Sequence, residues 1–204
     1  MENIIAILTS LVAILVSIST AAKNFSEAKK NFVPTKIKKQ SSLNIEIIKL
    51  MEELKEILKA DRIQIYDFHN GEHFANGRGA YKVSCSYEVV RIGEKGYQDI
   101  IQAIPLSMIP IFIQKLLDEK EMFVDDLEEI KDIMPSTYQF KKKQNIGAFY
   151  DMTLVNKQKE AIGFIGIQYS KSKSIVFGDY EKMQLMKYKY LIEEKLEEMI
   201  SNKK

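Results

Sequence analysis

Residues 146–155 (IGAFYDMTLV) and 161–169 (AIGFIGIQY) are two largely apolar stretches joined by the five polar residues 156–160 (NKQKE). Both stretches are rich in β-branched and aromatic residues, and the connector has the length of a hairpin loop. The sequence therefore predicts an antiparallel β-hairpin here. Because successive side chains of a strand alternate between faces, Tyr150 and Asp151 are expected on opposite faces of the first strand.

Two further strands are predicted at residues 62–68 (RIQIYDF) and 81–90, where polar and apolar side chains alternate. Residues 69–79 contain three glycines and are expected to form the loop between them. In the second strand one face is expected to be apolar, with Val83, Cys85, Tyr87 and Val89. The other face is expected to be a polar row of Lys82, Ser84, Ser86 and Glu88.

Two amphipathic helices are predicted around these strands, at residues 43–60 and 179–200, from apolar side chains repeated every three or four positions. Pro105 and Pro110 divide the middle of the chain into short pieces. A brief strand is expected at 122–126 and a short helix at 127–133. The predicted fold class is therefore α+β, with a central antiparallel sheet flanked by an N-terminal and a C-terminal helix.

This order of elements resembles a GAF domain, a PAS-like sensory fold. The resemblance covers roughly residues 43–200, and three stretches carry it: RIQIYDFHNGEHFANG (62–77), IPLSMIPIFIQKLLDEKEMFVDDL (104–127) and NIGAFYDMTLVNKQKEAIGFIGIQYSKSKSIVFGDYEKMQLM (145–186). It implies a small-molecule pocket closed by the middle segment over one sheet face, a homodimer formed through the helices at 43–60 and 180–200, and signalling to a partner. The cyclic-nucleotide motif of the family is missing, because Asn156-Lys157 lacks the following Phe and Asp-Glu.

The N-terminal residues 4–22 contain no charged side chain, and six lysines follow by position 39 against a single acid, Glu27. A helix of that length spans roughly 28 Å, about the thickness of the hydrocarbon core of a bilayer. The sequence predicts a transmembrane anchor at 1–22 in contact with lipid, a basic juxtamembrane linker at 23–42 interrupted by Pro34, and a GAF-like domain at 43–204. The lysines place the N-terminus outside and the domain in the cytoplasm.

A cleaved signal peptide and a buried core helix are alternatives to the anchor. The first is disfavoured because no Lys or Arg precedes the apolar stretch. The second is disfavoured because a domain of this size rarely buries a helix that is apolar on every side.

The distribution of charge and cysteine excludes several classes of protein. The chain has a net charge of +2, but residues 1–22 carry −1 and residues 23–40 carry +5, so residues 41–204 carry −2. A near-neutral domain argues against a nucleic-acid partner. Cys85 is the only cysteine, which excludes an internal disulfide and a multi-cysteine metal site. Its core-facing position also disfavours attachment of a bilin, and no other cofactor is indicated.

The candidate ligand-binding residues are His69, Asn70, Lys82, Ser84, Ser86 and Glu88. The two histidines, His69 and His73, suggest a weaker alternative, a metal-dependent enzyme, but glycines around them disfavour the helix that would align both rings. No catalytic motif stands out, so an enzyme is not expected. Lys141, Lys142 and Lys143 are expected to be solvated in a loop. The sequence favours a membrane-anchored sensor, and the alternative is a scaffold without a ligand.

Overall fold

The computed structural model describes residues 2–73, 76–77, 79–170 and 177–201. The chain divides into two compact units, residues 1–44 and 45–204. Helix α1 (Glu2–Leu58) includes the whole predicted linker, so the interruption expected at Pro34 was wrong. An interior proline removes one hydrogen bond and costs a helix roughly 3 kcal/mol, but it does not end α1, which continues through this position.

No helix among the described residues combines the length and the apolar content that a membrane span needs. The predicted anchor falls partly outside that description, because the side chains of residues 2–12 are not included in it.

Six strands form a single antiparallel sheet in the order β3-β2-β1-β6-β5-β4. The bounds are Arg62–His73 (β1), Gly79–Val90 (β2), Ile104–Pro105 (β3), Glu121–Val124 (β4), Ala148–Val155 (β5) and Ala161–Tyr169 (β6). Strands β5 and β6 form the predicted hairpin, and β4 confirms the brief strand. The two hydrophobic stretches quoted above therefore lie inside the sheet, and β4 forms one edge of it.

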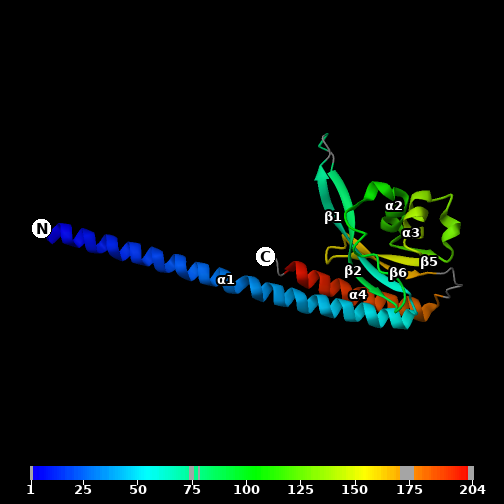
Figure 1. Cartoon of the computed structure of the whole chain (residues 1–204), viewed down its shortest axis with the longest axis horizontal. Coiled ribbons are helices and arrows are strands. Elements are labelled where there is room, and N and C mark those ends of the chain that lie inside the picture. Colours follow the sequence, from blue (N-terminus) through cyan, green and yellow to red (C-terminus); the bar gives the residue numbers. More distant parts are fainter. Residues whose placement is uncertain (1, 74–75, 78, 171–176, 202–204) are drawn as a thin grey trace. The chain divides into compact units, whose positions relative to one another are not determined.

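Helices cover both faces of the sheet (Figure 1). Residues 45–58 of α1 and helix α4 (Asp179–Ser201) lie side by side on one face. The short helices η1 (Leu106–Met108), α2 (Pro110–Glu119), η2 (Leu127–Ile130) and α3 (Pro135–Lys142) cover the other. The α+β class and the placement of the two long helices are confirmed.

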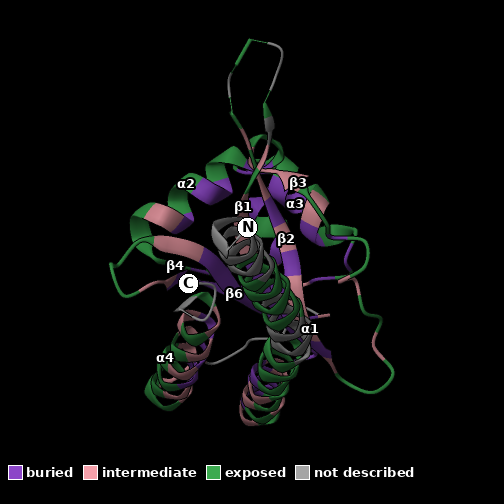
Figure 2. Cartoon of the chain, turned by 90° about the vertical axis from the view of Figure 1, so that its left-hand side faces the viewer, coloured by how far each residue is buried: buried purple, intermediate pink, exposed green. Residues whose placement is uncertain are grey.

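Each face of the sheet has its own hydrophobic core, and the buried residues in Figure 2 line the strands and the helix sides that meet them. The first core joins the sheet to the two long helices through Ile47, Met51, Leu54, Leu58, Leu185, Tyr188, Ile192 and Leu196. The second core joins the sheet to the short helices and contains a stack of Tyr66 on Phe164, with ring centroids 4.3 Å apart. The helical periodicity seen in the sequence thus selects the buried sides of both long helices.

The loop predicted at residues 69–79 is largely strand, because β1 continues to His73 and β2 begins at Gly79. Gly71 makes this close pairing possible. A Cβ atom at Gly71 would lie 2.0 Å from the carbonyl oxygen of Ala80, so any side chain there would push the two strands apart. The glycine therefore marks a close approach of two strands rather than a loop.

Candidate functional site

A β-bulge in β2 divides the predicted polar row. The register of β1 against β2 shifts between Ile65 and Tyr66, which leaves Ser86 without a partner residue. Side chains before the bulge, such as Cys85, lie in the second core, whereas Val89 after it lies in the first. A bulge changes the face to which the following side chains point. The expectation of a single polar face was therefore wrong for Lys82, Ser84, Ser86 and Glu88.

Three of the candidate ligand residues lie close together toward the hairpin end of β1 and β2. His69 pairs with Lys82 across the two strands. Its Nε2 atom lies 2.9 Å from Oγ of Ser84, and that oxygen also accepts a hydrogen bond of 2.8 Å from the N–H of Ala103. Asn70 follows on the exposed side of the strand. This cluster of His69, Lys82 and Ser84 is polar and partly exposed, so ligand contact here stays a prediction.

The histidines do not form a metal site of the predicted kind. His69 and His73 belong to one strand, and four residues of a strand extend over about 13 Å, too far for both rings to bind one ion. In the part of the chain that the structure describes, no group of three or more His, Cys, Asp or Glu side chains is placed to hold a metal ion.

The side chain of Glu88, which is 6% exposed, lies on the face of the short helices, where it organises the loop 91–102. Its carboxylate accepts hydrogen bonds from the backbone N–H groups of Tyr97 and Gln98, at 2.9 and 3.0 Å. It also lies 3.4 Å from Nε of Arg62 and accepts a 2.7 Å hydrogen bond from Gln64. A shallow polar hollow of about 480 Å³ lies beside it, lined by Glu88, Gly96, Gln98, Asp99 and Gln102. Glu88 therefore supports the wall of a hollow.

A buried polar network continues from Arg62 across the sheet. The guanidinium donates to the side-chain oxygen of Gln168 at 2.9 Å, and the amide of Gln168 donates to Gln64 at 2.6 Å. The hydroxyl of Tyr66 donates to the same oxygen of Gln64. All four side chains are at most 3% exposed. Buried polar groups are expensive unless they are satisfied, so this network fixes the register of β1 against β6.

Lys141 is the most unexpected residue of this face, because it was predicted to be solvated in a loop. It lies in the last turn of α3, is 1% exposed, and places Nζ 2.6 Å from Oδ2 of Asp151 on β5. Its ammonium also lies over the ring of Phe149, 4.2 Å from the centroid. Asp151 lies on this face and Tyr150 in the opposite core, as their alternation predicted. The sequence predicted the strand position of Asp151 but gave no sign that Lys141 would be buried beside it.

The pKa values of this pair are governed by burial. Burial lowers the pKa of Lys141 and raises the pKa of Asp151, and each charge partly offsets the shift of the other. The second carboxylate oxygen, Oδ1 of Asp151, is buried and makes no hydrogen bond within the described residues. The pair is thus a polar centre enclosed by aromatic rings.

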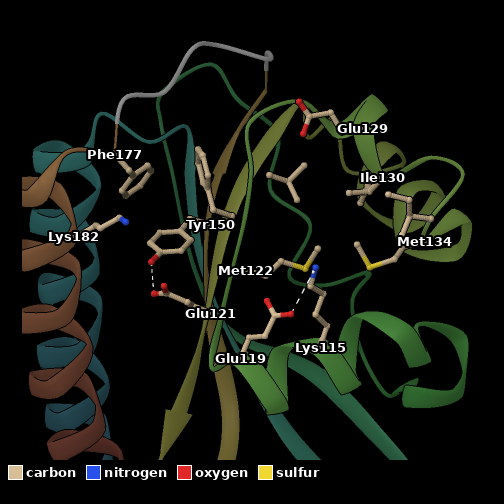
Figure 3. Close-up of a pocket in the computed structure, with 13 residues that line it drawn as sticks. Lys115, Glu119, Glu121, Met122, Glu129, Ile130, Met134, Tyr150, Phe177 and Lys182 are labelled. Atoms are coloured by element: carbon tan, nitrogen blue, oxygen red, sulfur yellow. Dashed lines mark hydrogen bonds and ion pairs between the residues drawn. The ribbon is translucent and has the colours of Figure 1, made fainter.

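A groove of about 650 Å³ runs along β4, the edge strand (Figure 3). One wall is aromatic: the rings of Phe123 and Phe177 lie 5.8 and 5.0 Å from that of Tyr150. The hydroxyl of Tyr150 donates to Glu121, and burial followed by this contact raises the pKa of the phenol. The complete lining is Lys115, Glu119, Glu121, Met122, Phe123, Val124, Glu129, Ile130, Ile133, Met134, Tyr150, Phe177 and Lys182. None of these residues is among the candidate ligand-binding residues that the sequence indicated.

Solved structures resemble this arrangement, although no family model and no curated protein sequence matches the chain. The blue-light absorbing form of the PixJ GAF domain from Thermosynechococcus elongatus has a TM-score of 0.58 at 15% identity. That match covers 82% of this chain and 94% of the other. The fold is GAF-like.

Two further neighbours support the assignment of the GAF-like fold. A GAF domain/HD domain protein from Geobacter sulfurreducens has a TM-score of 0.56 at 15% identity, covering 78% of this chain and 97% of its own. A domain of a putative two-component sensor histidine kinase from Sinorhizobium meliloti 1021 has a TM-score of 0.52 at 13% identity, with coverages of 76% and 91%. At these identities the likeness concerns the fold alone.

The single cysteine of the GAF-like domain is not placed for chemistry. Cys85 is 1% exposed in the second core, and its thiol donates to the carbonyl of Tyr87 at 3.3 Å. Burial raises the pKa of the thiol well above its ordinary value, which keeps it protonated and a poor nucleophile. The expected core-facing position of this residue is confirmed.

Proposed function

We propose that this chain is a membrane-anchored regulatory protein whose GAF-like domain binds a small molecule in the cytoplasm and signals through its two long helices. The observation that carries the proposal is the structural difference between the two faces of the sheet. One face packs against the two long helices, and the other holds a buried polar network under short helices. A change on the second face reaches the helices through a single layer of strands.

The membrane anchor is part of this proposal and is supported by the sequence of residues 4–22. The large apolar side chains described within it, Ile14, Leu15, Val16 and Ile18, are each about 60% exposed. Exposed apolar side chains on a helix are favourable when lipid surrounds them. We expect protease added to sealed inside-out membrane vesicles, in which the cytoplasmic side faces out, to digest residues 45–204. Protection of that unit in the same vesicles would contradict the topology.

The ligand is proposed to contact the cluster of His69, Lys82 and Ser84, with Asn70, Ser86 and Glu88 as the remaining candidate residues. We expect native mass spectrometry of the chain purified from its own source to show a retained small molecule. Lys82→Ala should remove that mass, because the lysine supplies the positive charge of the cluster. Lys157→Ala, an exposed lysine in the β5–β6 turn, is the matched control and should keep it.

A homodimer formed through the long helices is the proposed route of the signal. The side of α4 that faces away from the sheet presents Tyr180, Met183 and Tyr190, which are 57%, 57% and 66% exposed. Together with Lys187 and Glu194 they follow the three-and-four spacing of a coiled-coil seam. We expect Tyr190→Glu to shift a dimer to a monomer in sedimentation velocity. An unchanged dimer would remove α4 from the interface.

A scaffold without a ligand is the second candidate, and the packing of the second core favours it. Phe164 contacts Tyr66 by stacking and Phe112 edge to face, at 4.3 and 5.6 Å between centroids. These rings occupy the space between the sheet and α2. Absence of any bound molecule, together with an unchanged melting temperature across a metabolite library, would favour the scaffold over the sensor.

A further inference from the structure

Strand β4 is an edge strand of the sheet and pairs with β5 on one side. The backbone N–H of Thr153 donates to the carbonyl of Lys120 at 2.8 Å, which marks Lys120 as a residue that bonds toward β5. In an antiparallel ladder the direction alternates from one residue to the next. The N–H and C=O groups of Glu121 and Phe123 therefore point away from β5. Within the described residues, neither Glu121 nor Phe123 makes a backbone hydrogen bond to a turn, a loop or a helix cap.

The two walls of the groove lie on opposite faces of the sheet. The aromatic wall of Phe123, Tyr150 and Phe177 is on the face of the long helices, because Tyr150 and Phe177 pack in the first core. The other wall, with Ile130 and Met134, belongs to the second core. A strand added along β4 would send alternate side chains to the two faces, so each set would meet an apolar wall.

The segment around the groove is strongly acidic. Residues 118–132 contain eight Asp and Glu side chains against two lysines, a formal balance of −6 within a chain whose net charge is +2. Glu121 and Glu129 are part of the lining itself. Lys115 and Lys182 also line the groove. Lys115 lies 3.7 Å from Glu119 and Lys142 lies 3.4 Å from Glu128, so with Lys182 these three lysines reduce the local formal balance to −3, which is still acidic. The electrostatic field along this edge therefore attracts a basic partner.

We propose that the β4 groove binds an extended segment of a partner protein, which adds as a strand beside β4 with apolar residues at its centre and Lys or Arg at its ends. This inference goes beyond the proposed sensing function, because it gives the domain a partner-binding surface distinct from the cluster at His69. The backbone groups that point away from β5 supply affinity, the two walls select apolar side chains on both faces, and the acidic segment selects basic flanks.

The test uses the full chain, residues 1–204, and a fluorescein-labelled peptide of sequence KKTVFVTKK in a polarisation assay. We expect saturable binding, and we expect none for the peptide EETVFVTEE, which keeps the apolar centre and reverses the charge. Phe123→Pro removes both the outward N–H and the ring, whereas Phe123→Ala removes only the ring. The proline variant should bind about tenfold more weakly than the alanine variant.

Charge variants keep the proposal testable if the proline variant does not fold. Glu129→Lys should weaken peptide binding about threefold or more, since it reverses a charge in the lining. Glu160→Lys makes the same change on an exposed residue of the β5–β6 turn, outside the groove, and should leave binding unchanged. Equal effects of the two charge reversals, equal binding by the proline and alanine variants, or no peptide binding would each overturn the proposal. Self-association of the chain that Phe123→Pro abolishes would also overturn it, because a second copy would then occupy the edge.

Discussion

Asp151→Asn is expected to destabilise the GAF-like domain by about 3–5 kcal/mol, because it leaves the buried ammonium of Lys141 without its counter-charge. The wild-type pair is separated by 2.6 Å, and both side chains are at most 1% exposed. Asparagine keeps the size of the side chain, so the loss of stability results from the missing negative charge and not from a cavity. Urea unfolding followed by circular dichroism measures the difference in the free energy of unfolding.

The same variant should gain stability as the pH rises. Burial already lowers the pKa of Lys141 below its ordinary 10.5, and Asp151 is the group that opposes this shift. Without the carboxylate, the folded state of the variant binds fewer protons than the unfolded state between the lowered pKa and 10.5. The free energy of unfolding therefore increases with pH in that window.

A double substitution separates an uncompensated charge from lost packing. Lys141→Met combined with Asp151→Leu removes both charges and is expected to recover most of the stability lost in Asp151→Asn. If the double variant were as unstable as the single one, the pair would contribute through its geometry and not through mutual compensation of charge.

Gly163→Ala is expected to cost about 3 kcal/mol or more and to disrupt the pairing of β1 with β6. A Cβ atom at Gly163 would lie 1.9 Å from the carbonyl oxygen of Tyr66 and 3.1 Å from Cα of Asp67. These are backbone atoms of the neighbouring strand, so relief requires the strands to separate. A large fall in the urea midpoint is the expected measurement.

Gly79→Ala is the matched control for this strand glycine. Its Cβ atom would meet only the ring of Tyr81, at 3.8 Å, which is an ordinary contact. We expect a change of less than about 1 kcal/mol there. Similar losses at both positions would show that glycine is needed for chain flexibility and not for the close approach to Tyr66.

The sequence was sufficient for the elements whose periodicity is strong. The buried sides of α4 and of residues 45–58 of α1 follow from apolar spacing, and the β5–β6 hairpin follows from two apolar stretches and a short polar connector. Alternation along β5 also placed Tyr150 and Asp151 on opposite faces. These features depend on local repeats that the sequence displays directly.

The candidate site depended on features without a local signal. One unpaired residue at Ser86 changes which side chains of β2 share a face, and nothing in an alternating stretch indicates where a bulge will fall. Likewise, three consecutive lysines are typical of a solvated segment. The partner that forms an ion pair with Lys141 is Asp151, ten residues further along and on a different element.

The amino-acid sequence by itself determined the class of the fold, its hairpin, its two long helices and the charge asymmetry of the chain. The tertiary structure alone decided that Lys141 is buried, that Glu88 supports a loop, and that β4 is the edge strand beside an aromatic groove. The physical reason is that periodicity and charge are properties of neighbours in sequence. Burial and edge exposure are set by which distant segments meet.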